Sequence, residues 1–174
     1  MRDTYDVKIL PTVTLANGKT LYQSKAIINC IGAKAGLHPT DPLDIYKGEL
    51  MFQNLVDEYM LSGKGIYSVN FASTPEARQE KFEMVRPLWP DLAEKLNACL
   101  SDDKRFIAGD KMTTYDYVVG INLINLMENP NHHDETRAFW IEIRNSSPIR
   151  LQRYILNVQA ELMPYLAMRP KLPK

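Results

Sequence analysis

The sequence predicts a mainly α-helical protein, in which a short β-hairpin and one helix lead into a bundle of about five helices. Two observations support this fold class. An Asn-Gly pair near the N-terminus lies between two β-prone segments, which is typical of a hairpin. Almost all of the chain after it has apolar residues at helical spacing, preceded by capping residues or prolines.

The hairpin is predicted at residues 11–15 and 19–22, because Asn17-Gly18 between them accepts the positive φ angles of a type I′ turn. Ser24 follows and has the residue type of an N-cap, so we expect a helix to begin there. Gly36 comes after the last apolar residue of this helical pattern and suits a helix C-terminus.

The later helices are predicted from their first residues. Asp41-Pro42 and Thr74-Pro75 each combine an N-cap with a proline at the first helical position. The second of these helices should run to about residue 100, with a kink where Pro87 and Pro90 interrupt its pattern. Three more helices are expected after Gly109-Asp110, over 134–144 and after Ser147-Pro148.

Composition argues against two classes of partner. The chain has 21 Lys and Arg against 21 Asp and Glu and no basic run, so nothing in it predicts binding to nucleic acid or to an anionic membrane surface. The most apolar stretch, residues 117–127, contains Gly120, Asn122 and Asn125 and is too short to cross a bilayer. We therefore predict no membrane insertion.

The cysteines and histidines indicate neither a disulfide framework nor a metal site. Cys30 and Cys99 are too few for a framework and lack metal-ligand spacing, so we expect free thiols in the cytoplasm or another reducing intracellular compartment. His132-His133 has no third ligand nearby, and we predict a solvated loop there. No metal cofactor is predicted.

Four groups of residues, in this order, resemble a known family. They are Leu10-Pro11, then Leu-Tyr-Gln-Ser-Lys-Ala-Ile at 21–27 with Gly36-Leu37, then Phe-Ile-Ala-Gly-Asp at 106–110 with Thr-Thr-Tyr-Asp at 113–116, and Pro-Tyr-Leu-Ala-Met-Arg-Pro at 164–170. With these motifs the chain resembles the soluble glutathione S-transferases, and it looks closest to their alpha, mu and sigma branch.

The resemblance implies two parts. Residues 1–38 would be a truncated thioredoxin-like, glutathione-binding subdomain, reduced to a β-hairpin and one helix, and residues 39–174 an all-helical C-terminal domain. Thr113 and Asp116 match the family's buried capping box, whose role is in folding. Tyr115 stands where the family usually has a small residue, so we expect the packing there to differ.

The resemblance also implies residues that contact glutathione. Pro11 matches a proline with a cis peptide bond, which leaves the backbone of Leu10 free to pair with the ligand. Gln23 and Ser24 match a pair that holds the γ-glutamyl end, and a helix N-terminus suits an anionic carboxylate. Asp57 matches an acidic residue that reaches the glutathione of a neighbouring subunit.

Each of these residues has a structural interpretation as well. Ser24 can cap a helix without any ligand, and a proline is common at the start of a strand. Asp57 can be a solvated charge on a helix. The sequence leaves both interpretations open.

No catalytic residue is predicted. In the family the catalytic Tyr, Ser or Cys ends the first strand of a βαβ unit, which takes about 30 residues or more, whereas ten residues precede Pro11. Tyr5 is too close to Pro11 for that role, and Ile9 replaces a frequent glutamine. Without that strand, the edge from Thr12 to Leu15 would be open to pairing with another chain.

Two functions follow as hypotheses. The first is a non-catalytic scaffold or interaction subunit of a larger assembly, in which a protein partner covers the edge near Thr12 to Leu15 or the chain forms a homodimer. The second is a glutathione transferase that conjugates glutathione, its substrate, to hydrophobic electrophiles, with the catalytic segment missing from this chain or supplied by another. A helical adaptor unrelated to glutathione fits the composition but leaves the ordered motifs unexplained.

Overall fold

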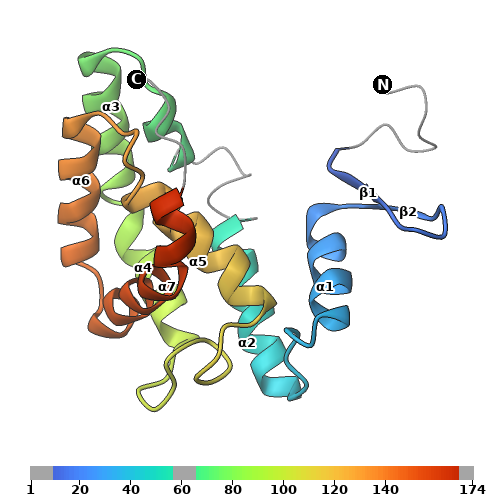
Figure 1. Ribbon diagram of the computed structural model, residues 1–174. Helices are drawn as coiled ribbons and strands as arrows, with labels where there is room; N and C mark the ends of the chain where they lie inside the picture. The colour runs from blue at the N-terminus through green and yellow to red at the C-terminus, as the bar shows by residue number, and fades with distance from the viewer. Residues whose placement is uncertain (1–9, 57–65, 169–174) are drawn as a thin grey trace.

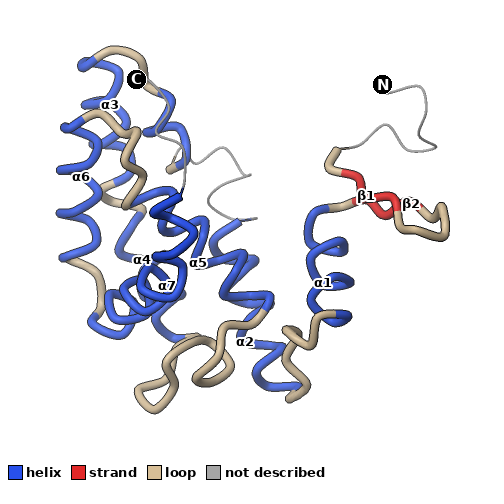
Figure 2. The backbone as a smooth tube through the Cα atoms, in the orientation of Figure 1, coloured by secondary structure: helices blue, strands red, loops and turns tan. Residues whose placement is uncertain are grey.

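The computed structural model describes residues 10–56 and 66–168, which form two parts (Figure 1). The first part holds the strands β1 (Thr12–Thr14) and β2 (Thr20–Tyr22) and the helix α1 (Ser24–Lys34). The second part is helical (Figure 2), so the predicted fold class is confirmed. Its elements are α2 (Pro42–Phe52), the 3-10 helix η3 (Tyr67–Phe71), α3 (Pro75–Val85), α4 (Trp89–Ala98), α5 (Thr114–Met127), α6 (Asp134–Asn145) and α7 (Ile149–Met168).

The hairpin forms at the predicted Asn-Gly turn. Strands β1 and β2 are antiparallel with Val13 opposite Leu21, and Gly18 has a φ of 82°. The Asn17 side chain closes the turn by accepting a hydrogen bond from the Lys19 N–H at 3.1 Å. Among the described residues β1 pairs with β2 alone.

The start of α1 differs from the prediction. Gln23 is the N-cap, its side chain makes no capping hydrogen bond, and Ser24 is the first helical residue. The end of α1 is as predicted: Gly36 has a φ of 69°, and the N–H of Leu37 donates to the Gly32 carbonyl at 2.8 Å. This bond belongs to a Schellman motif, which needs a residue in the left-handed region.

The helix predicted up to residue 100 is two helices. α3 ends at Val85 and α4 begins at Trp89, with Pro87 in the break, because a proline inside a helix removes a hydrogen bond and clashes with the preceding turn. Pro90 lies in the first turn of α4, where it is tolerated. This break raises the helical part from about five helices to six α-helices within the described residues.

The core lies where α2, α6 and α7 pack around α5 (Figure 1). Trp89 and Trp140 are both buried there, with ring centroids 6.2 Å apart in an edge-to-face arrangement. Phe82 stacks on Phe139 at 4.3 Å. Within residues 10–56 and 66–168, none of the helices is long and apolar enough to cross a membrane.

One further prediction, on the two adjacent histidines, has its outcome here. His132 and His133 were predicted to lie in a solvated loop: His133 is exposed, but His132 is buried at 5% exposure, with its N–H closing a turn to the Asn129 carbonyl at 3.1 Å. Asp57, Tyr5 and Ile9 lie outside the described residues.

Candidate functional site

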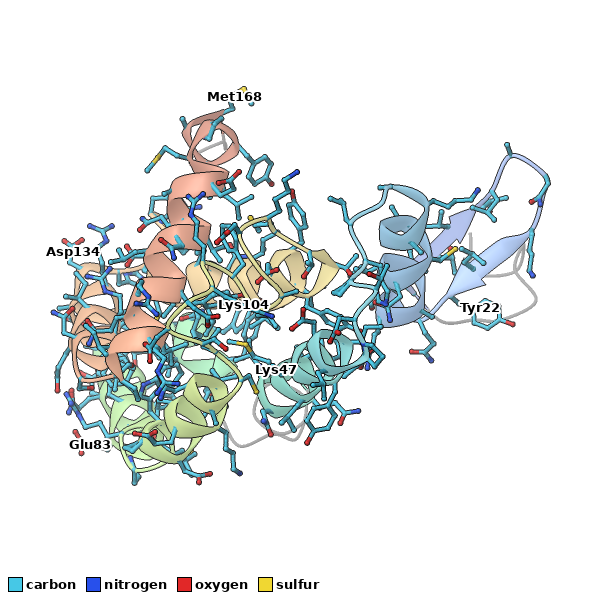
Figure 3. The ribbon with its side chains drawn as sticks, turned by 90° about the horizontal axis from the view of Figure 1, so that it is seen from below. Tyr22, Lys47, Glu83, Lys104, Asp134 and Met168 are labelled. Carbon is cyan, nitrogen blue, oxygen red and sulfur yellow. The ribbon has the colours of Figure 1, made fainter. Side chains whose placement is uncertain are left out.

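The predicted glutathione-contacting residues that the structure describes lie together at one end of the hairpin. β1 follows the Leu10-Pro11 peptide bond, which is cis. Because Thr12 pairs with Tyr22, Pro11 lies beside Gln23, where β2 ends and α1 begins. Leu10, Pro11, Gln23 and Ser24 are all exposed. Figure 3 shows Tyr22 on the sheet side of the molecule, with α1 between the sheet and the helical part.

Gln23 has an unusual backbone conformation. Its φ of 72° and ψ of 112° make it the one non-glycine residue with a positive φ in the described part of the chain. Such a conformation costs about 1–3 kcal/mol and is typical of ligand-binding turns and active sites. Here it lets the chain pass within one residue from β2 directly into α1.

The first turn of α1 carries no acidic residue of its own, and the charge of its Lys25 is paired with Glu49 of α2. The Gln23 side chain leaves the N–H groups of this turn uncapped. The partial positive charge of the helix N-terminus is therefore not offset within the turn, which suits an anionic carboxylate. Helices α2 to α6 differ, since their first turns carry Asp44, Glu76, Asp91, Asp116, and Asp134 with Glu135, whereas the first turn of α7 has no acidic residue either.

A second cluster fixes the start of α5. The buried Asp116 carboxylate accepts hydrogen bonds from the Thr113 N–H at 2.7 Å, the Thr113 hydroxyl at 2.7 Å and the Ile107 N–H at 3.0 Å. Thr113 and Asp116 thus form a capping box. Burial raises the pKa of Asp116, and these hydrogen bonds oppose that shift. Burial, together with the nearby Asp116, also raises the pKa of the Tyr154 hydroxyl well above its usual range.

The helix α1 is attached to the helical part through the residues between these capping positions. The Thr114 N–H donates to the Leu37 carbonyl at 3.0 Å, and the Thr114 hydroxyl lies 3.0 Å from Nδ1 of His38. The Tyr115 hydroxyl donates to Glu49 Oε1 at 2.7 Å, and the other oxygen of Glu49 pairs with Lys25. The altered packing was predicted at Tyr115. The Lys25–Glu49 ion pair beside it was not predicted.

The remaining features of the described surface lie away from the turn at Gln23. A groove of about 410 Å³ lies at the opposite end of α1, between residues 36–44 and 108–113. No group of three or more His, Cys, Asp or Glu side chains is placed to hold a metal ion within residues 10–56 and 66–168. The turn at Gln23, where the predicted residues of β1, β2 and α1 meet, is the candidate site.

Comparison with known proteins finds solved structures of similar fold. No protein-family model and no curated protein sequence matches the chain. Among solved structures, the chain is similar to the glutathione S-transferase from Ascaris lumbricoides, with a TM-score of 0.67, 18% identity, and coverage of 99% of this chain and 80% of that one. It is also similar to rat hPGDS complexed with a quinoline, with a TM-score of 0.67, 19% identity, and coverage of 98% of this chain and 78% of that one.

A third similar structure is the maleylpyruvate isomerase from Pseudomonas aeruginosa PAO1, with a TM-score of 0.50, 20% identity, and coverage of 89% of this chain and 75% of that one. At these identities the likeness is one of fold. The resemblance predicted from the ordered motifs is confirmed at that level: the chain has a glutathione S-transferase-like fold.

Proposed function

We propose that this protein binds glutathione at the turn between β2 and α1. The observation that supports it is the start of α1: a strained, non-glycine N-cap and a first turn without an acid, both beside the cis Leu10-Pro11 peptide. Residues 1–38 and 39–174 would be the glutathione-binding and helical parts. Two free cysteines favour the cytoplasm or another reducing compartment.

The proposed contacts follow from the donors at the turn. The γ-glutamyl carboxylate of glutathione would accept hydrogen bonds from the N–H groups of the first turn of α1 and from the Ser24 hydroxyl. Gln23 would contact the same end of the ligand, and the backbone of Leu10 would pair with its peptide. These contacts orient the tripeptide and leave its thiol free.

A transferase reaction would use this orientation. The thiolate of glutathione attacks an electrophilic carbon of a hydrophobic substrate, a C–S bond forms, and the leaving group departs with the bonding electrons. We assign no thiolate-stabilising hydroxyl within residues 10–56 and 66–168. In this proposal that hydroxyl comes from another segment or another chain, and Asp57 keeps its predicted contact with a neighbouring glutathione.

A non-catalytic interaction subunit is the second candidate. Its support is the edge of β1, which has no neighbouring strand other than β2 in the described part of the chain, with the 68% exposed Leu10 just before it. A strand of a protein partner, or a second copy in a homodimer, could pair along Thr12 to Leu15. Bound glutathione would then be a ligand and not a substrate.

Calorimetric titration of the full chain with glutathione tests the binding site. Gln23→Ala should weaken binding about tenfold or more, since hydrogen bonds to charged groups contribute about 1.5–3 kcal/mol. Gln79→Ala, which removes an exposed glutamine from α3, is the matched control and should leave affinity unchanged. No binding by the unmodified chain, or equal affinities for all three proteins, would refute the site.

Turnover separates the two candidates. The full chain is incubated with glutathione and an aromatic chloride electrophile, and thioether formation is followed by absorbance. Turnover above the uncatalysed rate excludes the non-catalytic subunit. Binding without turnover excludes a transferase that is active as this chain alone, and leaves the non-catalytic subunit or a transferase whose hydroxyl comes from another chain.

A further inference from the structure

The start of α1 is connected to the core of the helical part by a chain of polar contacts. Lys25, in the first turn of α1, pairs with Glu49 of α2. Glu49 in turn accepts a hydrogen bond of 2.7 Å from the hydroxyl of Tyr115 on α5. Lys25 also lies 4.9 Å from the centre of the Phe52 ring. Three helices thus meet on the single carboxylate of Glu49.

Tyr115 is held firmly in this arrangement. Its side chain is 2% exposed, and its ring packs on the bare backbone of Gly48, where any Cβ would overlap the ring. The His38 ring lies 5.5 Å from it. Burial raises the pKa of the Tyr115 hydroxyl, so it keeps its proton and donates to Glu49 at neutral pH. A buried, packed ring therefore fixes where Glu49 lies.

The other end of α1 is attached to the same helix. Thr114 donates its N–H to the Leu37 carbonyl just beyond α1, and its methyl group packs against Gly32. Consecutive residues of α5 therefore hold α1 at both ends, Thr114 directly and Tyr115 through Glu49 and Lys25. The first turn of α1 is the end that carries Ser24, next to the strained Gln23.

We propose that Glu49 and Tyr115 are positioning residues for the glutathione site, holding the first turn of α1 so that its N–H groups face the bound carboxylate. This inference rests on the proposed function. Lys25 links α1 to Glu49, and this ion pair holds the Lys25 side chain on the side of α2. Neither Glu49 nor Tyr115 touches the ligand.

The test uses Tyr115→Phe and Glu49→Gln in the full chain. Tyr115→Phe keeps the ring on Gly48 and removes only the donor, so the fold is retained. Each variant should weaken glutathione binding about fivefold, the lower end of typical coupling between two sites. The double variant should bind no more weakly than either single one, because both changes break the same chain of contacts.

Two matched controls separate positioning from general destabilisation. Tyr117→Phe removes a hydroxyl two residues further along α5, and Glu142→Gln breaks the ion pair with Arg86 far from α1. Both should leave glutathione affinity unchanged. Hydrogen exchange without glutathione is the second readout: Tyr115→Phe and Glu49→Gln should speed exchange in the first turn of α1 and leave the amides of α7 protected.

Each result decides one claim. Weaker binding with faster exchange in α1 supports the positioning role. Faster exchange with unchanged affinity overturns it, and so does an equal loss of affinity in the controls. If the unmodified chain does not bind glutathione, the proposed function fails and the positioning role fails with it, while exchange still reports whether the contacts hold α1.

Discussion

Gly48 in α2 provides a sharp test of how α2 and α5 pack. A Cβ at this position would lie 2.8 Å from Cε2 of Tyr115 and closer still to Cγ and Cδ2. Carbon atoms pack best at about 3.5–4.0 Å. Gly48→Ala therefore forces the buried ring of Tyr115 or the backbone of α2 to move, and neither is the far end of a flexible side chain.

Two opposing effects set the magnitude. Overpacking a core costs about 1–3 kcal/mol, whereas alanine in place of glycine inside a helix gains about 1 kcal/mol. Overpacking wins, and we expect Gly48→Ala to lower the free energy of unfolding by about 1 kcal/mol. In a Tyr115→Ala background the ring is gone, so the same change should raise it by about 1 kcal/mol.

Urea unfolding of the four proteins of this cycle, followed by far-ultraviolet circular dichroism, measures the reversal of sign. The control is Gly120→Ala, because a Cβ at Gly120 would lie 2.6 Å from Val158. This change should lower the free energy of unfolding with or without Tyr115. The claim that the Tyr115 ring packs on Gly48 is refuted if Gly48→Ala stabilises the unmodified protein, or if it has the same effect with Tyr115 and with Tyr115→Ala.

Three further predictions concern the site and the core. Gln23→Gly should raise the free energy of unfolding by about 1 kcal/mol in urea titrations, because glycine accepts a positive φ, yet weaken glutathione binding in calorimetry. Asp116 has a raised folded-state pKa, so between its unfolded pKa of about 3.9 and that raised value the folded state binds more protons than the unfolded state, and stability falls as pH rises through this window. Urea midpoints of Asp116→Asn should lack this fall. Ser147→Ala removes the acceptor, at 2.9 Å, of the buried Trp89 indole N–H and should cost about 1–3 kcal/mol in the same assay.

Features that depend on neighbouring residues were predictable from the sequence. Asn17-Gly18 makes its turn with its own backbone and side chain, and Asp41 caps α2 by accepting from Leu43 and Asp44, two and three residues away. Such signals need no knowledge of tertiary contacts. The order of hairpin and helices followed from them.

Features that depend on distant contacts were not predictable. Glu49 and Tyr115 are 66 residues apart, and the sequence signals only that Tyr115 is unusual for its position. Ser24 is a good N-cap residue, but the direct passage from strand to helix places Gln23 at the cap and moves Ser24 inside the helix. His132 follows a turn whose polar residues indicate solvent, and tertiary packing buries it.

The start of α5 shows how one turn can serve folding and the site at once. Successive helical residues point about 100° apart, so Thr113 and Asp116 face the loop that carries Ile107, while the residues between them face α1 and α2. A defect in the capping box would shift Tyr115 and thereby α1. Asp116→Asn should for this reason weaken glutathione binding even at a pH where the variant is as stable as the unmodified protein, whereas a change in α7 of equal cost should not.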